Sequence, residues 1–305
     1  MNIFSVVLGM TGSISLFLYA VISFGKLIKE NAGQKIKELL YSMTSNPVKG
    51  VFFGAISTAI LQSSTATSVI VASLADAGVI SFYHSIGIIF GVNIGTTITS
   101  QLIAFNIMSI SPYIIILGVL LYFWGRGYKK YAKSIIYFGL LFYSIYLISI
   151  FALKIDNNVI GYILSFNQNI LFIILIGIVS SVILQSSAVV TGLVLVFVGN
   201  GTISIIQAVG LILGANIGTT STVLIASTAM GKDGKKVAFT HLLFNFVGVI
   251  IFLPVLKYFI IFVELIGGDI VHKVANIHLL FNLFCVFIFL LMIRPFSILI
   301  NKIIK

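Results

Sequence analysis

One polar motif occurs twice in a chain that is otherwise strongly apolar. Residues 62–64 read Gln-Ser-Ser and residues 93–97 read Asn-Ile-Gly-Thr-Thr; residues 185–187 and 216–220 repeat both elements, displaced by 123 positions. Uncharged polar side chains are costly in hydrocarbon unless they have partners or a task. Polar interruptions at matching positions of two halves are the best indication in a sequence of a transporter's binding site. The duplication therefore predicts one site built from both halves.

The composition places the chain in a lipid bilayer. It is 59% hydrophobic and 8% charged, whereas soluble domains carry about 25% charged residues. Apolar runs of about 20 residues between short basic stretches are typical of helices rather than of a β-barrel. The net charge of +11 does not indicate nucleic-acid binding, because the basic residues lie in short loops between spans. We therefore expect a single all-α, polytopic transmembrane domain over residues 1–305.

The distribution of lysine and arginine predicts the topology. Basic loops at 26–37, 126–133 and 232–236, and the basic tail from Arg294, are expected in the cytoplasm. The connections between them, including 264–272, hold few cations and are expected outside. This pattern places the N-terminus outside the cell membrane and the C-terminus in the cytoplasm.

Segments 47–80 and 168–201 have lengths that fit neither one membrane crossing nor two. As a single helix each would be about 50 Å long, against a hydrocarbon core of about 30 Å. Each is therefore predicted to form a re-entrant helical hairpin with Gln-Ser-Ser at its tip. Three crossings at 83–106, 110–125 and 134–153 lie between the hairpins, and an odd number inverts the second repeat relative to the first. The other expected helices are 1–25, 203–229, 237–258 and 273–293.

Each repeat core, 47–106 and 168–229, is predicted to combine a hairpin with a broken helix. The second half of each hairpin is expected to start near Ser64 or Ser187, where free N–H groups and a partial positive charge suit an anion. Glycine in the Asn-Ile-Gly-Thr-Thr sequence permits unwinding, and Asn and Thr oxygens are hard ligands that suit Na⁺. Because no Asp or Glu lies deep in a predicted span, Na⁺ coupling is favoured over proton coupling.

A shorter repetition reads His241-Leu-Leu-Phe-Asn245 and His278-Leu-Leu-Phe-Asn282. The spacing puts His and Asn on one helix face. Hydrogen bonding between helices is the favoured interpretation, and ligand binding or gating is the alternative. Asp76 is interpreted as a solvated residue near the cytoplasmic mouth, with a role as gate or ion entrance as the alternative.

The paired motifs resemble the signature of the type II sodium–phosphate cotransporters and their bacterial relatives, and His241-x-x-Phe-Asn resembles a further motif of that family. The resemblance covers about 47–292. It implies Na⁺-driven transport of inorganic phosphate, no enzymatic activity, and no cofactor besides the coupling ion. It implies phosphate binding by Gln62, Ser63, Ser64, Thr65, Gln185, Ser186 and Ser187. It implies sodium binding or support by Asn93, Thr96, Thr97, Asn216, Thr219 and Thr220.

The chain also departs from the family pattern. The second tip continues with Ala188, so it has one hydroxyl fewer than the first. We expect a symporter without the PhoU-like domain that many bacterial relatives carry. The alternatives are a Na⁺-coupled transporter of another oxyanion or small carboxylate, a passive anion channel, and a membrane scaffold or sensor that binds without transport. Both repeats in one chain suffice for a site, although a homodimer is possible.

Overall fold

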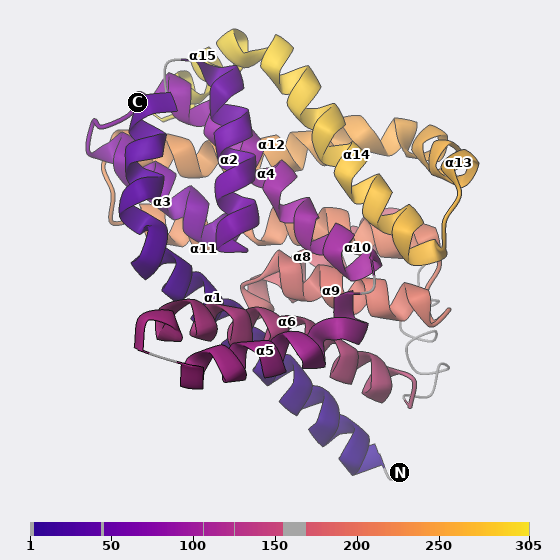
Figure 1. The fold of residues 1–305 in the computed structure, drawn as a ribbon. Coiled ribbons are helices and arrows are strands. Elements are labelled where there is room, and N and C mark those ends of the chain that lie inside the picture. Colours follow the sequence, from indigo (N-terminus) through magenta and orange to yellow (C-terminus); the bar gives the residue numbers. More distant parts are fainter. Residues whose placement is uncertain (1–2, 44–45, 106, 125, 155–168, 305) are drawn as a thin grey trace.

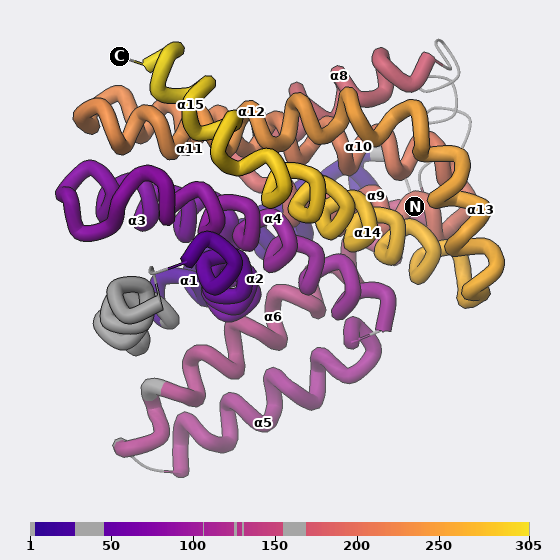
Figure 2. Tube along the Cα trace, turned by 90° about the horizontal axis from the view of Figure 1, so that it is seen from above, coloured from indigo at the N-terminus to yellow at the C-terminus, as the bar shows by residue number. Residues whose placement is uncertain are grey.

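The computed structural model describes residues 3–43, 46–105, 107–124, 126–154 and 169–304, and every regular element in these ranges is a helix (Figures 1 and 2). Seven helical segments in these ranges are long and apolar enough to cross a membrane, and each overlaps one of the seven predicted crossings. They are Phe4–Leu27, Phe82–Ala104, Ile107–Trp124, Tyr131–Ala152, Ile205–Ser227, Lys232–Ile266 and Ile270–Leu291. The chain is an all-α, multi-pass membrane protein, as its composition predicts.

Helix α1 (Ile3–Met43) is longer than the sequence analysis predicts. The expected helix ends at residue 25, before a basic loop, whereas α1 continues through that stretch to a total of 41 residues. Its apolar part, Phe4–Leu27, is the part that fits a membrane crossing. The second part is rich in Lys, Glu, Gln, Ala and Leu and has no Pro, and these residues favour a helix even where their charge suggests a loop.

Two pairs of half-helices confirm the predicted breaks. Both breaks fall at the Gln-Ser pair of the motif, and the second half-helix begins at Ser64 in one pair and at Ser187 in the other. The half-helices have 13 or 15 residues, so each is about 20–23 Å long and shorter than a hydrocarbon core of about 30 Å. They are α2 (Pro47–Leu61), α3 (Ser64–Asp76), α8 (Ile170–Leu184) and α9 (Ser187–Gly199).

The helix after the first hairpin does not unwind. Helix α4 (Phe82–Ala104) is continuous, so the predicted break at 93–97 is wrong. In the second repeat α10 (Ile205–Gly218) and α11 (Thr220–Ser227) meet at Thr219, whose backbone angles of φ −63° and ψ −22° remain helical.

The glycines of the motif instead allow close packing. A Cβ atom at Gly91 would overlap the carbonyl oxygen of Val51 in α2, and one at Gly214 would overlap that of Ile174 in α8. In the described part of the chain, α2 with α4 and α8 with α10 are the two most extensively packed helix pairs. Small residues at such contacts let two backbones approach closely in a membrane, which is why the glycines are compatible with intact helices.

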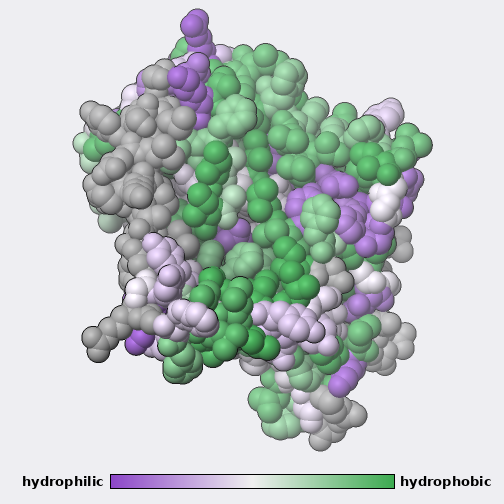
Figure 3. Space-filling model, in the orientation of Figure 1, coloured by the Kyte–Doolittle hydropathy of each residue, from purple (hydrophilic) through white to green (hydrophobic). Residues whose placement is uncertain are grey.

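Helices α1, α5 (Ser111–Trp124) and α6 (Lys129–Ala152) form one side of the molecule (Figure 1). Helix α6 packs against both of the others, while α5 lies at the edge (Figure 2) and has just two buried residues, Ser111 and Gly118. Large apolar side chains are exposed along this and other helices, and much of the surface shown in Figure 3 is hydrophobic. Short 3₁₀ turns flank α5: η1 (Ile107–Ile110) and η2 (Arg126–Tyr128).

The C-terminal third has more helices than the two expected at 237–258 and 273–293. The connection expected at 264–272 is largely helical, and the basic tail is also a helix whose residues Ile293, Phe296 and Ile300 are buried. Their spacing of three and four residues is that of an amphipathic helix. The elements are α12 (Lys232–Phe252), η3 (Leu253–Val255), α13 (Leu256–Ile266), α14 (Ile270–Leu291) and α15 (Ile293–Ile303).

Candidate functional site

Gln62 and Gln185 have the same unusual backbone conformation. Gln62 has φ 51° and ψ 29°, and Gln185 has φ 51° and ψ 25°. Among the described residues they are the only ones other than glycine with a positive φ. A left-handed residue ends a helix abruptly and costs about 1–2 kcal/mol in an L-amino acid. Both tips therefore carry glutamine at a position where glycine would adopt the same conformation at lower cost.

The serine that follows each glutamine starts the next half-helix. Ser63 and Ser186 are the N-cap residues of α3 and α9, and both have extended backbone angles. Each hydroxyl oxygen accepts a hydrogen bond from the backbone N–H three residues later, at 3.1 Å in the first repeat and 3.4 Å in the second. The other N–H groups of the first turn have no partner within the helix, so each tip presents donors and a partial positive charge.

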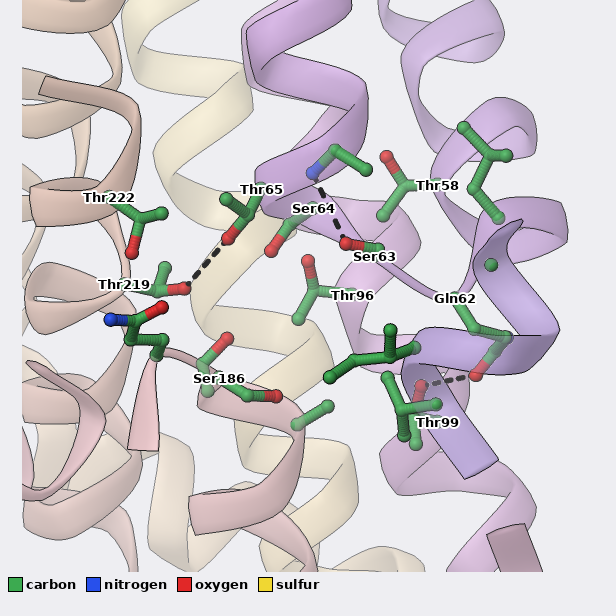
Figure 4. Close-up of a pocket in the computed structure, with 18 of the residues that line it drawn as sticks. Thr58, Gln62, Ser63, Ser64, Thr65, Thr96, Thr99, Ser186, Thr219 and Thr222 are labelled. Atoms are coloured by element: carbon green, nitrogen blue, oxygen red, sulfur yellow. Dashed lines mark hydrogen bonds between the residues drawn. The ribbon is translucent and has the colours of Figure 1, made fainter. Parts of the chain in front are cut away.

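Both tips line one cavity of about 660 Å³ (Figure 4). This volume is far larger than the roughly 10–15 Å³ that one water requires. All seven residues predicted to bind phosphate line it, and so do Thr96 and Thr219 from the predicted sodium set. The lining residues that the sequence analysis did not single out for the site include Lys26, Thr58, Thr99 and Thr222.

The other four predicted sodium residues do not line the cavity. Asn93, Thr97 and Thr220 donate side-chain hydrogen bonds to carbonyl oxygens of their own helices, at 2.9, 2.7 and 2.7 Å. The Nδ2 atom of Asn216 is 3.3 Å from Nε2 of His278. All four are buried, but only Asn216 links its helix to another one, through His278 of α14.

The two glutamine amides have different surroundings. Gln62 is 8% exposed; its Nε2 donates to the carbonyl of Ala59 at 2.6 Å, and its Oε1 accepts from the hydroxyl of Thr99 at 2.7 Å. Gln185 is exposed and makes no such side-chain bond to the described residues. Thr222, which matches Thr99 under the displacement of 123, lines the cavity as Thr99 does but does not hydrogen-bond to Gln185. The amide of Gln62 is therefore occupied by hydrogen bonds within the protein, while the exposed amide of Gln185 is available to a ligand.

One hydrogen bond joins the two repeats inside the cavity. The hydroxyl oxygens of Thr65 in α3 and Thr219 between α10 and α11 are 3.4 Å apart (Figure 4). The equivalent positions, Ala188 and Thr96, also line the cavity. Because alanine has no hydroxyl, that pair cannot form the same bond, and Thr96 donates to the carbonyl of Val92 at 3.0 Å. The cavity is thus asymmetric: the Thr65–Thr219 pair has two hydroxyls and a hydrogen bond between the repeats, and the equivalent Ala188–Thr96 pair has one hydroxyl and no such bond.

Neither His-Asn pair lines the cavity. The histidines bond to other helices, which confirms the favoured interpretation for them, whereas Asn245 and Asn282 donate to carbonyls of their own helices. Nδ1 of His241 is 3.1 Å from the hydroxyl of Ser68 in α3. Nδ1 of His278 is 2.9 Å from the hydroxyl of Ser100 in α4, and its Nε2 contacts Asn216 in α10. His278 therefore bridges a helix of each repeat.

We expect His278→Ala to lower the Tm of the purified protein in detergent. The change leaves the hydroxyl of Ser100 and the amide of Asn216 without their partner in a buried region, which should cost about 1–3 kcal/mol. His84→Ala is the matched control, because His84 is half-buried near the start of α4 and should change the Tm little. Equal Tm values for the two variants would show that the bridge contributes no stability.

Asp76, expected to be solvated, is exposed but not isolated. Its Oδ1 atom accepts a hydrogen bond of 3.4 Å from the backbone N–H of Gly234, in the first turn of α12. A carboxylate near a helix N-terminus is stabilised by the helix dipole. Asp76 therefore ties the end of the first hairpin to α12.

Comparison with known proteins matches both halves of the chain to one family. The sequence model of the Na⁺/Pi-cotransporter family matches residues 16–150 and 155–292. An uncharacterized protein YqeW of Bacillus subtilis is 34% identical over 275 residues, which cover 88% of each chain. No solved structure matches the chain significantly.

Other relatives are longer than this chain. The putative inorganic phosphate export protein YjbB of Escherichia coli is 29% identical over 202 residues, covering 65% of this chain and 37% of YjbB. The sodium-dependent phosphate transport protein 2B of Bos taurus is 41% identical over 86 residues, covering 27% of this chain and 12% of that protein. Since the family model matches most of the sequence, the chain belongs to the Na⁺/Pi-cotransporter family.

Proposed function

We propose that this protein is a sodium-coupled symporter of inorganic phosphate in the cell membrane. Family membership supports the proposal, and so do the names of relatives described as phosphate export and sodium-dependent phosphate transport proteins. The observation that carries it is that both Gln-Ser-Ser tips line the same cavity. The proposal requires no cofactor beyond Na⁺ as the coupling ion.

Phosphate would bind between the tips. The N-termini of α3 and α9 line the cavity at Ser64 and Ser187, and their free N–H groups stabilise an anion. The hydroxyls of Ser63 and Ser186 accept the capping hydrogen bonds, so their own hydrogens remain able to donate to an oxyanion. The exposed amide of Gln185 adds two further donors.

Sodium would bind at hydroxyl oxygens beside the phosphate. Thr65, Thr96 and Thr219 line the cavity and offer hard oxygen ligands. Asn93, which bonds within α4, and Asn216, which contacts His278 of α14, would support the surrounding helices. Among the described residues that line the cavity there is no Asp or Glu. A co-bound Na⁺ would therefore supply positive charge close to the phosphate, and this mutual stabilisation would couple the two ions.

Alternating access would expose the cavity to each side of the membrane in turn. The N-terminus would lie outside and the C-terminus in the cytoplasm, following the positive-inside rule. It also treats the two hairpin repeats as inverted, which is a common construction in transporters of this kind.

The test is uptake of radiolabelled phosphate into proteoliposomes of the purified protein, with an imposed Na⁺ gradient or an equal K⁺ gradient. We expect saturable accumulation above equilibrium with Na⁺ and none with K⁺. Sulfate and a small dicarboxylate, each added in tenfold excess, should compete poorly.

Each other result would favour a different function. Equal, non-saturating flux in both gradients would indicate a passive anion channel. Stronger inhibition by sulfate or dicarboxylate than by unlabelled phosphate would indicate another substrate. Phosphate binding without flux would indicate a sensor or scaffold.

A further inference from the structure

Lys26 is the only charged residue among the described residues that line the cavity. Every other polar lining group is a neutral hydroxyl or amide. The charge pattern predicts Lys26 in a cytoplasmic loop, but the structure places it in helix α1. A lone cation has a disproportionate influence on an anion in a cavity whose other walls are neutral.

The position of Lys26 places it at the mouth of the cavity. The preceding residue, Gly25, touches the first tip, because a Cβ atom there would lie 3.4 Å from the carbonyl oxygen of Leu61. Lys26 is near the end of the apolar span Phe4–Leu27. Its side chain is exposed and yet lines the cavity, so the cavity is open to the surroundings at this point.

The rest of this α1 face is apolar. Leu18, Val21 and Ile22 line the cavity one and two turns before Lys26. The four-carbon stem of lysine can lie along such a face while its ammonium group remains in water. The ammonium group can therefore contact an anion that approaches the tips, while the apolar stem lies against the helix.

We propose that Lys26 is the recruiting residue that attracts the anion to the cavity mouth and thereby sets its apparent affinity. This inference rests on the proposed function, since it assigns Lys26 to the phosphate path. A charge at the mouth raises the local concentration of an anion and its rate of association, and the effect declines with ionic strength. It does not act on the conformational step, so it should alter KM and leave kcat unchanged.

The chain allows a sharp test by chemical modification. It has a single cysteine, Cys285, which is buried, so a cysteine placed at position 26 can be modified alone. The proposed topology puts residue 26 on the cytoplasmic side, so Lys26→Cys should raise the KM for phosphate supplied from that side about tenfold at low ionic strength, with kcat within twofold of the wild type. Modification with cationic aminoethyl methanethiosulfonate should restore the KM. The anionic sulfonatoethyl reagent should raise it further, and the difference between the two should shrink at high salt.

Lys49→Cys is the matched control, because Lys49 is exposed in the first turn of α2 and does not line the cavity. Neither reagent should alter its KM. A KM unchanged in Lys26→Cys, or moved equally by both reagents, would overturn the assignment. Equilibrium binding of radiolabelled phosphate to the same variants separates the recruiting role from the transport function. If the wild type binds phosphate, Lys26→Cys binds it more weakly and none of the proteins takes it up, the recruiting role would be supported and the transport function refuted.

Discussion

Gly91→Leu should abolish the recovery of folded protein, and Gly214→Leu should do the same from the second repeat. Even a Cβ atom at either glycine would overlap a backbone carbonyl oxygen of the facing helix. Overpacking against movable side chains typically costs about 1–3 kcal/mol. Here the obstacle is main chain, which cannot rotate away, so the whole of α2 or α8 would have to separate from its partner. The loss of stability should exceed that range.

The measurement is the fraction of monodisperse protein on size-exclusion chromatography in detergent, together with the Tm of whatever is recovered. Gly12→Leu is the control, since a Cβ at Gly12 in α1 meets no atom within 4 Å, and it should be recovered like the wild type. If Gly91→Leu gave folded protein with an unchanged Tm, the close contact of α2 and α4 would not exist.

These glycines also show where sequence reasoning stops. Glycine in the Asn-Ile-Gly-Thr-Thr sequence is compatible with two opposite structures, because it both weakens a helix and allows another backbone to approach. The choice depends on Val51, a residue 40 positions before Gly91 in the sequence. No local pattern contains that partner, so the predicted unwinding was wrong although the right residues were identified.

The hairpin breaks could be predicted because two independent constraints agree on them. The apolar segments are the wrong length for one or two crossings, and the same polar triplet interrupts both. That reasoning also gives the starts of the second half-helices, at Ser64 and Ser187. By contrast, Lys and Glu after residue 25 of α1 fit a loop or an exposed helix equally well, and only the structure shows which occurs.

Part of the cavity could have been found from the repeat itself. Thr99 and Thr222 are another pair of identical residues displaced by 123 positions, and both line the cavity. The repeat does not identify Lys26, because this residue belongs to α1, which lies outside both repeat cores. Its position depends on how α1 crosses the first tip, which is a property of the tertiary fold.

Gln185→Gly should lower phosphate uptake at least tenfold while leaving the Tm unchanged or slightly raised. Glycine adopts the left-handed backbone of this position (φ 51°) without the penalty that glutamine carries. The exposed amide makes no side-chain hydrogen bond to the described residues, so the substitution removes no hydrogen bond that those residues provide. A loss of uptake would thus be due to the missing amide, and we expect a fall of at least tenfold if it donates to the substrate.

Gln62→Gly should behave differently although the two backbones are alike. Removing this amide deprives the hydroxyl of Thr99 and the carbonyl of Ala59 of their partners, at a cost of about 1–3 kcal/mol for buried groups. The relief of backbone strain offsets part of that cost, so the Tm should fall moderately and uptake should fall with it. Thr99→Val should reproduce much of the fall in Tm, whereas Thr222→Val should not. If Gln62→Gly and Gln185→Gly shifted the Tm and uptake equally, the difference between an amide bonded within the protein in the first tip and a binding amide in the second would be refuted.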